Sequence, residues 1–259
     1  MLRQTHSICL LERSSDYGRL YETIGRYLAE GYGVIYAAEQ DPEWVINKMA
    51  KAGLQVEQHI RNGTLRVISG ESVYVSNGDD LDASRTIESW LSVVSNIMNN
   101  TKVKGVIAIG SVDAFIKRGR HKSSAEYETH IGKKFEVPLE AICCYNADSL
   151  SDMSAGTLIT ILNAHQYTIH DNAEYSEWEG DKLQSILIAA FDRVLGTTTS
   201  ALVLKTLKSV YKLDERSIIS EPTLLEDVLG KFFRASSNAI LASILKNLKS
   251  EMAFHRQTI

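Results

Sequence analysis

Along the first two-thirds of the chain, short apolar runs alternate with longer segments in which apolar residues recur every three or four positions. A short run rich in β-branched residues is typical of a strand, and the longer spacing is typical of an amphipathic helix. Strands are predicted at residues 6–12, 34–38, 64–69, 103–109, 139–145 and 166–170. Their alternation with helices predicts an α/β fold in which helices cover both faces of a mainly parallel sheet.

Local signals place several element ends in this region. Asp41 followed by Pro42 predicts a helix start, with the aspartate as N-cap and the proline at the first helical position. Gly53 is the predicted end of that helix. The polar stretches at residues 70–82 and 117–124 are predicted to be the most mobile loops.

From about residue 180 the pattern shows helical periodicity and no strand signal. We therefore divide the chain into an α/β domain at residues 1–175 and a small all-α domain at residues 180–259. The spacing of Thr223 and Glu226 predicts a capping box within the second domain. Its helices are predicted at residues 182–195, 200–211, 223–233 and 237–254.

The last of these helices carries an apolar stripe, formed by Leu241, Ile244, Leu245 and Leu248. Such a stripe is buried in the core of a helical domain or in a dimer interface. The sequence leaves both uses open.

Composition and charge narrow the class of protein. Hydrophobic residues make up 44% of the chain and charged residues 23%, as in ordinary globular proteins. No run approaches the roughly 20 apolar residues of a membrane span, so we expect no membrane insertion.

The net charge of -4 provides no general attraction for nucleic acid, which is not an expected partner. The three cysteines lie in apolar runs and indicate no disulfide framework, which favours a cytoplasmic location.

The residues with the most reactive side chains lack the spacing of known motifs. Histidine and cysteine occur at His6, Cys9, Cys143, Cys144 and His165, without the paired CxxC or HxxxH arrangement of a metal site. No GxSxG segment marks a nucleophilic serine. The sequence therefore predicts neither a metal, nor a cofactor, nor nucleophilic catalysis.

The first strand, its loop and its helix precede the segment GYGVIYAAEQDPEWV, and this order resembles the opening of KaiC-like RecA-fold ATPases. In that family a glycine-rich loop with a lysine cradles the phosphates. Residues 12–19 carry one glycine and no lysine, which argues against ATPase activity. Arg13 or Arg19 remains available to a smaller anion, and Ser14 or Ser15 to cap the following helix. Glu39 and Asp113 follow strands as catalytic carboxylates do in such enzymes, although ordinary loop acids occupy the same places.

Five further blocks keep a common order along residues 6–172: HSICLLE, RYLAEGYGVIYAAEQDPEWV, AKAGLQVEQHIRNGTLRVISGESVYV, AICCYNADSL and ILNAHQYTIHDN. Together they resemble the MEDS domain, a sensory domain of methanogen and methylotroph regulators. The resemblance implies a non-catalytic RecA-like fold that senses a small organic molecule. It also implies sensory roles for the positions that fall here on His6, Tyr74, Cys144, Tyr145 and His165.

The tail contains two more blocks, FDRVLGTTTSALVLKTLKSVYKLDERSI and TLLEDVLGKFFRASSNAILASILKNL. They resemble the small helical Nitrosopumilus output domain of ammonia-oxidising archaea. The resemblance implies an archaeal signalling protein with a helical output domain. The expected partner is a downstream signalling protein, and the apolar stripe of the last helix leaves self-association open as well.

Ligands of open parallel sheets bind at the carboxyl ends of the strands, where the loops diverge. The ligand-binding residues predicted there are Arg13, Ser14, Tyr17, Glu39, Tyr74, Asp113 and Tyr145. The leading hypothesis is a cytoplasmic sensor whose small organic ligand shifts the loops at residues 70–82 and 117–124. Two alternatives stay open: a divergent KaiC-like ATPase that uses Glu39 and Asp113, and a transcriptional regulator whose tail contacts DNA.

Overall fold

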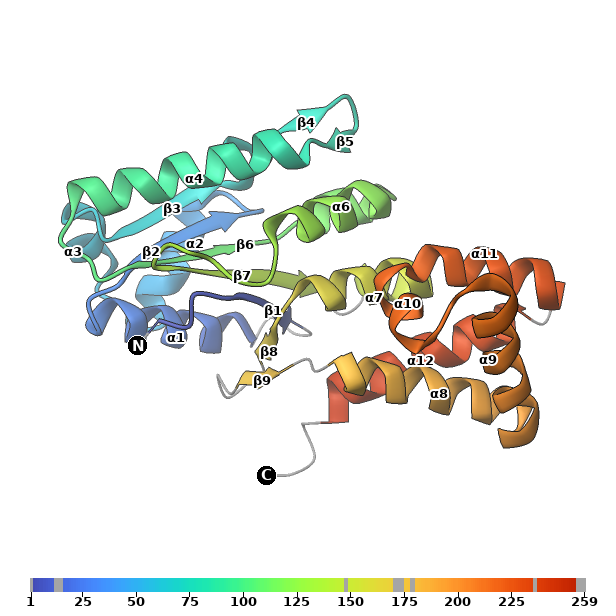
Figure 1. Ribbon diagram of the computed structural model, residues 1–259. Coiled ribbons are helices and arrows are strands. Elements are labelled where there is room, and N and C mark those ends of the chain that lie inside the picture. Colours follow the sequence, from blue (N-terminus) through green and yellow to red (C-terminus); the bar gives the residue numbers. More distant parts are fainter. Residues whose placement is uncertain are drawn as a thin grey trace. The chain divides into compact units, whose positions relative to one another are not determined.

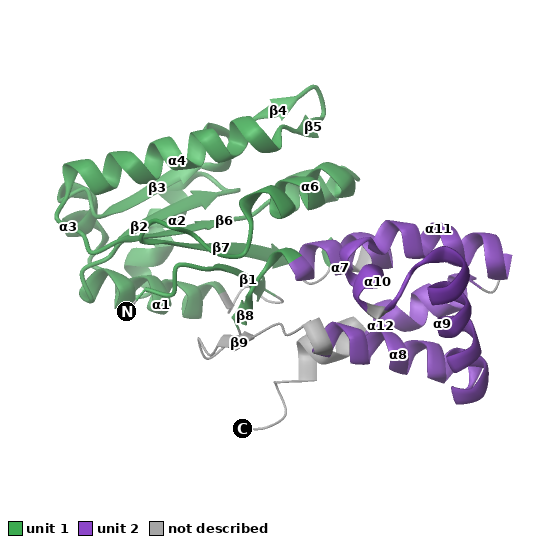
Figure 2. Cartoon of the chain, in the orientation of Figure 1, with its two compact units in different colours: residues 1–151, 164–177 green, residues 152–163, 178–259 purple. Residues whose placement is uncertain are grey.

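The computed structural model describes residues 2–11, 16–146, 149–169, 175–177, 180–234 and 237–254. The chain forms two compact units (Figure 2). The first, the α/β unit, contains residues 1–151 and 164–177, and the second, the helical unit, contains residues 152–163 and 178–259. Residues 152–163 thus lie in the helical unit although they precede residue 175 in the sequence.

A seven-stranded sheet forms the centre of the α/β unit (Figure 1). Its strands are β1 (His6–Leu11), β2 (Gly33–Ala38), β3 (Leu65–Ser69), β6 (Val106–Gly110), β7 (Leu139–Asn146), β8 (Tyr167–Ile169) and β9 (Tyr175–Glu177). The order across the sheet is β3-β2-β6-β7-β1-β8-β9, and β9 alone among these strands runs antiparallel to its neighbour. The predicted mainly parallel α/β sheet is confirmed, and all six predicted strands form.

Helices cover both faces of this sheet, as predicted (Figure 1). On one face lie α1 (Asp16–Ala29), α2 (Pro42–Lys51) and α3 (Val56–Arg61). On the other lie α4 (Ala83–Asn100) and α6 (His121–Ile131). The short α5 (Asp113–Lys117) begins three residues after β6 ends.

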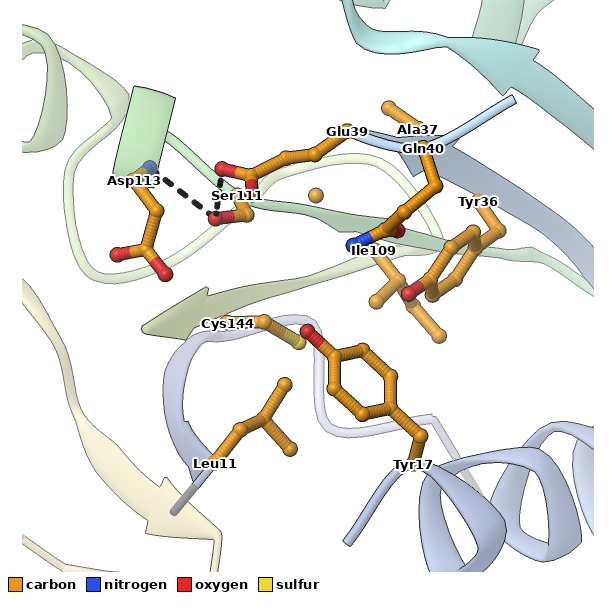
Figure 3. Close-up of a pocket in the computed structure, with 11 residues that line it drawn as sticks. Leu11, Tyr17, Tyr36, Ala37, Glu39, Gln40, Ile109, Ser111, Asp113 and Cys144 are labelled. Atoms are coloured by element: carbon orange, nitrogen blue, oxygen red, sulfur yellow. Dashed lines mark hydrogen bonds between the residues drawn. The ribbon is translucent and has the colours of Figure 1, made fainter. Parts of the chain in front are cut away.

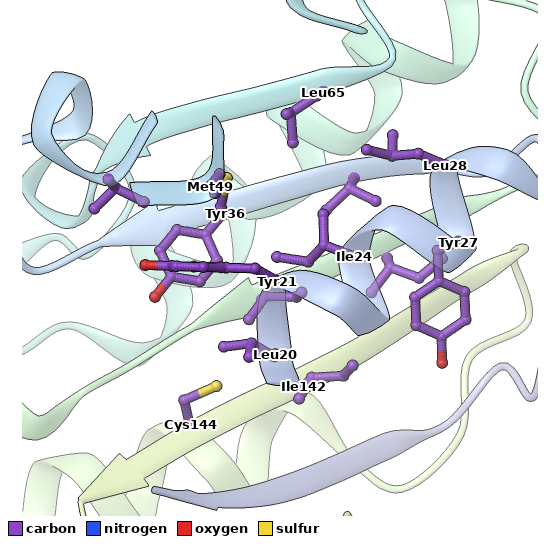
Figure 4. Close-up of a cluster of buried hydrophobic side chains, with 14 of the residues drawn as sticks. Leu20, Tyr21, Ile24, Tyr27, Leu28, Tyr36, Met49, Leu65, Ile142 and Cys144 are labelled. Atoms are coloured by element: carbon purple, nitrogen blue, oxygen red, sulfur yellow. The ribbon is translucent and has the colours of Figure 1, made fainter. Parts of the chain in front are cut away.

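Alternation along the strands divides the buried side chains between the two faces. Tyr36 packs with Ile24 and Met49 in the core under α1 and α2 (Figure 4), whereas Ile35 packs with Val94 and other residues under α4. The same alternation separates two adjacent cysteines, because successive side chains of a strand point to opposite faces. Cys144 belongs to the core beneath α1, whereas Cys143 lines a cavity with residues of α4 and α6.

Helix starts follow the local signals in part. The Asp41 side chain accepts a hydrogen bond from the Trp44 backbone N–H at 2.9 Å, which confirms the predicted N-cap of α2. Residues 70–82 form the 3-10 turn η1 (Gly70–Ser72) and a small hairpin of β4 (Ser76–Asn77) and β5 (Asp80–Leu81).

The prediction of a loop at residues 117–124 is wrong for most of its length, because Lys117 is the last residue of α5 and α6 begins at His121. The Arg120 carbonyl accepts hydrogen bonds from the Ser124 backbone N–H at 3.1 Å and from the Ser124 hydroxyl at 2.9 Å. The Arg120 side chain also pairs with Asp79 at 2.8 Å. These contacts stabilise the first turn of α6. The polar composition of this segment does not predict a helix.

The helical unit contains most of α7 (Ala155–Ala164), then α8 (Gly180–Leu195), α9 (Thr197–Tyr211), α10 (Glu215–Ser220), α11 (Pro222–Phe233) and α12 (Ser237–Phe254). Four of these match the predicted helices, while α7 and α10 were not predicted. Asp214 caps α10 by accepting hydrogen bonds from the backbone N–H groups of Arg216 and Ser217. Ile244 of the predicted apolar stripe is fully buried.

The predicted capping box at Thr223 and Glu226 is wrong. Helix α11 begins at Pro222 and has no side-chain cap. The Glu226 carboxylate instead accepts hydrogen bonds from the Gly156 backbone N–H at 2.6 Å and the Ser154 hydroxyl at 3.2 Å. It therefore satisfies the start of α7, a tertiary contact that local spacing cannot reveal.

Within the described part of the chain, none of the helices combines the length and the apolar character needed to cross a bilayer.

Tight backbone packing beside β6 generates a stability prediction. A Cβ atom on Gly105 would lie 2.6 Å from the Pro138 carbonyl oxygen, which belongs to the backbone and has little freedom to move. We expect Gly105→Ala to lower the free energy of unfolding by about 1–3 kcal/mol. Denaturant titration followed by circular dichroism measures the change.

The matched control is Gly18→Ala in α1, where no atom lies within 4 Å of the added Cβ. This substitution should be neutral or stabilising by up to about 1 kcal/mol, because alanine favours helix over glycine. Equal effects of the two substitutions would contradict the packing described for Gly105.

Candidate functional site

A small pocket, here called the rim pocket, lies where the strands of the α/β unit end (Figure 3). Four of the residues predicted from sequence line it together: Tyr17, Glu39, Asp113 and Cys144. Its cavity volume is about 10 Å³, which is close to the least space that one water molecule needs. The described residues that line the rim pocket therefore enclose little free space.

Glu39 is engaged in holding α5. One carboxylate oxygen accepts hydrogen bonds from the Ser111 hydroxyl at 3.1 Å and the Ala114 backbone N–H at 3.0 Å. The other oxygen lies 3.7 Å from the Lys117 ammonium group. Because α5 has no side-chain cap of its own, Glu39 supplies that function from the end of β2.

Asp113 is buried at the start of α5, and its carboxylate accepts a hydrogen bond from the Asn146 backbone N–H at 2.8 Å. Burial raises the pKa of Asp113 to about 6, against the lowering effect of the Asn146 hydrogen bond and with a further raising contribution from the charge of Glu39. The carboxylate therefore changes charge close to neutral pH.

A second group of polar residues lies on the α6 side of the sheet. We call it the Glu128 cluster; it consists of His6, Glu128, Cys143, Tyr145 and His165, all buried. Glu128 projects from α6, His6 from β1, and Cys143 from β7. Tyr145 is also on β7, and His165 lies two residues before the start of β8.

The contacts within the Glu128 cluster are short. The same Glu128 oxygen lies 3.1 Å from His6 Nε2, 3.4 Å from Cys143 Sγ and 3.5 Å from His165 Nε2. His6 Nε2 also lies 3.1 Å from Cys143 Sγ. The Tyr145 hydroxyl donates a hydrogen bond to the other Glu128 oxygen. One carboxylate thus joins four side chains from three other segments.

The environment of the cluster shifts its protonation equilibria. Burial acts to raise the pKa of Glu128, but the hydrogen bond from His6 and the charges of the two histidines outweigh it, so the pKa lies below its ordinary value. Burial and the Glu128 charge raise the pKa of the Cys143 thiol and of Tyr145 well above their ordinary values. Glu128 is therefore the anion of the cluster.

Next to the cluster lies an apolar cavity of about 190 Å³, which we call the α4–α6 cavity. Its walls come mainly from α4, α6, β6 and β7, and the residues that line it include Tyr74, Trp90, Val94, Ala108, Tyr127, Phe135, Ala141 and Cys143. Trp90 carries a buried indole N–H that has no hydrogen-bond partner among the described residues. Cys143 belongs to both the cavity and the Glu128 cluster.

The structure therefore separates the predicted site residues into three places. Arg13 and Ser14 lie outside the described residues. The rim pocket holds Tyr17, Glu39, Asp113 and Cys144, the α4–α6 cavity holds Tyr74, and the Glu128 cluster holds His6, Tyr145 and His165.

Sequence reasoning missed Glu128, Cys143 and Trp90. The period-two spacing of Cys143 and Tyr145 on one strand was the available signal, because it places these two side chains on one face and Cys144 on the other. The predicted loop at residues 117–124 also hides Glu128, because it leaves the start and the buried face of α6 unassigned.

The α/β unit thus combines an apolar cavity with a buried polar cluster on the α6 side of its sheet. The chain belongs to the MEDS family, because the model of the MEthanogen/methylotroph, DcmR Sensory domain matches residues 5–166. The fold and the family agree with the sensory domain that the sequence resembles.

No curated protein sequence matches the chain significantly. Among solved structures, the chain is similar to the uncharacterized protein PH0321 from Pyrococcus horikoshii, determined in complex with an unknown peptide. The two share 10% sequence identity with a TM-score of 0.49, over 64% of this chain and 76% of the other.

The raised pKa of Asp113 predicts a pH-dependent stability. Because the folded-state pKa of about 6 exceeds the ordinary value of 3.8, the folded protein binds this proton more tightly, and stability from this group falls as pH rises from about 4 to 6. Asp113→Asn keeps an oxygen for the Asn146 N–H and removes the titration. The variant should gain stability relative to wild type between pH 4 and 7, by at most about 3 kcal/mol.

Chemical denaturation of both proteins at several pH values measures this difference. A difference that stays constant from pH 4 to 7 would show that Asp113 titrates normally.

Proposed function

We propose that this protein is a cytoplasmic sensor whose α/β unit binds a small, mainly apolar organic molecule in the α4–α6 cavity. The observation that carries the proposal is an apolar cavity of about 190 Å³ within a domain of a sensory family. The proposed ligand site lies between the sheet and helices α4 and α6, and not at the rim of the sheet.

The size and lining of the cavity support this ligand class. Dry apolar cavities of about 150 Å³ bind benzene or xenon, and the α4–α6 cavity is of similar size. Its walls are almost wholly aliphatic and aromatic. The buried N–H of Trp90 favours a ligand with one hydrogen-bond acceptor, which would remove the cost of leaving that donor unsatisfied.

The polar residues at the rim of the sheet favour sensing over ATP hydrolysis. Glu39, the carboxylate that an ATPase would need, already caps α5 and pairs with Lys117. The rim pocket beside it has space for about one water molecule.

For signalling, the ligand must bind one arrangement of α4 and α6 more tightly than another. We propose that the helical unit passes this change to a downstream protein or to a second copy of the chain. The three cysteines are free and buried, which suits a reducing cytoplasm.

Filling the cavity tests the location of the site. Ala141 lines the cavity from β7, and Ala141→Leu should weaken binding of benzene and of 2-butanone at least about tenfold, because the added carbons occupy the ligand volume. Methyl resonances of Ile87 and Val94, which also line the cavity, report binding by NMR in the full chain.

Ala50→Leu is the matched control, since Ala50 is exposed on α2. It should leave both affinities unchanged. Unaltered binding in Ala141→Leu, or ligand-induced shifts confined to residues around Glu39 and Asp113, would place the ligand elsewhere.

Calorimetric titration with Mg-ATP separates the sensor from an ATPase. We expect no binding at micromolar concentrations and no phosphate release. Turnover that Glu39→Gln abolishes would establish the ATPase instead.

A further inference from the structure

Four side chains of the Glu128 cluster bring metal-binding atoms together. His6, Glu128, Cys143 and His165 each offer one nitrogen, oxygen or sulfur atom, and these four atoms lie within 4.8 Å of one another. The residues are fully buried or nearly so, and they come from separate segments of the α/β unit. No short sequence motif marks such a set, because the fold alone assembles it.

The spacing of these atoms fits a tetrahedral ion. Zinc binds nitrogen and carboxylate oxygen at about 2.0–2.2 Å and sulfur at about 2.3 Å, so its ligand atoms lie roughly 3.3–3.6 Å apart. The contacts that Glu128 makes with His6, Cys143 and His165 are 3.1, 3.4 and 3.5 Å. Since all four ligand atoms lie within 4.8 Å of one another, an ion at the centre would draw the more widely spaced atoms together.

The hydrogen bonding of His6 leaves a lone pair directed at the cluster. Its Nδ1 lies 3.3 Å from the Ala164 carbonyl oxygen, which only accepts, so Nδ1 carries a proton. In the neutral ring Nε2 is then an acceptor, and it faces the carboxylate of Glu128 at 3.1 Å. Two acceptors at this distance need a cation between them, which is either a proton on Nε2 or a metal ion.

The charges of the four side chains and the hydrogen bonds that hold them also suit a divalent ion. One thiolate from Cys143 and one carboxylate from Glu128 balance a charge of +2, and a buried site is least costly when it is neutral. Metal-bound histidines usually donate their second N–H to a carbonyl, and metal-bound carboxylates are held by hydrogen bonds. Ala164 and the Tyr145 hydroxyl occupy these outer positions.

We propose that His6, Glu128, Cys143 and His165 form a binding site for one divalent transition-metal ion of the zinc type. The mixture of imidazole, thiolate and carboxylate selects such ions over magnesium and calcium, which prefer oxygen ligands alone. Cys143 also lines the α4–α6 cavity, which gives the ion a route to the cluster. Metal binding here does not depend on the organic ligand.

The test uses the full chain after removal of metal by a chelator. One equivalent of Co²⁺ should produce visible d–d bands of tetrahedral geometry and a near-ultraviolet thiolate charge-transfer band. One equivalent of Zn²⁺ should displace the cobalt and raise the melting temperature, because the ion binds the folded state, whereas Mg²⁺ should do neither. A wild-type protein without the thiolate band would overturn the proposal, whatever the variants do.

The adjacent cysteines provide a matched pair of variants. Cys143→Ser should lose the thiolate band and weaken Zn²⁺ binding more than about 100-fold, which exceeds the usual effect of an outer-contact substitution. Cys144→Ser, on the opposite face, should keep the band and the affinity. Tyr145→Phe should keep the band and lose about 10–100-fold in affinity.

Loss of the band in Cys144→Ser, or its retention in Cys143→Ser, would overturn this assignment of ligands. Benzene binding is measured separately on the metal-free protein. The test of the metal site therefore does not depend on the result for the proposed sensor function.

Discussion

The buried carboxylate of Glu128 is the constraint on which the α/β unit depends. An ionised carboxylate without solvent must be compensated, because leaving a buried charge unpaired costs several kcal/mol (about 3–5). Its partners are His6, Cys143, Tyr145 and His165, which come from β1, β7 and the segment before β8. Satisfying one charge therefore fixes helix α6 against three parts of the sheet. Tyr127 and Ile131 of the same helix line the α4–α6 cavity, so the position of Glu128 also determines one cavity wall.

The Glu128 cluster is not explained by a contribution to the folding stability of the α/β unit. Replacing a buried ionic network by apolar residues of similar volume is often neutral or stabilising, and the surrounding walls are already apolar. An apolar set of residues would pack α6 on the sheet without the desolvation cost. The presence of two histidines, a thiol and a carboxylate at one point is therefore better explained by what they bind or sense than by the fold they support.

The fold was predictable because its determinants are local. The apolar runs gave the six parallel strands, and the Asp41-Pro42 pair gave the start of α2, since each depends on neighbouring residues. The failures have a common physical cause. Glu226 looked like a local cap but satisfies Gly156 and Ser154, 70 or more residues away. The first turn of α6 looked like a loop because its stability comes from contacts of Arg120 rather than from apolar spacing.

The candidate site was predictable only in part, for the same reason. Chemistry-bearing residues such as His6, Tyr145 and His165 could be named, but their shared partner Glu128 could not, because only the tertiary fold brings it within reach of both histidines. The choice between Cys143 and Cys144 depended on the face of β7 that each occupies. Strand alternation shows only that Cys143 shares a face of β7 with Tyr145 and that Cys144 lies on the other face. To know which of these faces α6 covers, the order of the strands and the positions of the helices are needed.

The division of these two cysteines also bears on how occupancy of the cavity would be sensed. Cys143 contacts the cavity on one side and Glu128 on the other, while Tyr127 lies next to Glu128 along α6. A molecule that displaces Tyr127 or Cys143 would change distances to a carboxylate whose partners leave little room for adjustment. In a tightly packed interior such a change is not absorbed gradually but shifts one arrangement to another. Binding of an uncharged molecule in the cavity would thus change the electrostatic contacts of the Glu128 cluster. A sensor of small apolar molecules requires such a difference in interaction between its two arrangements.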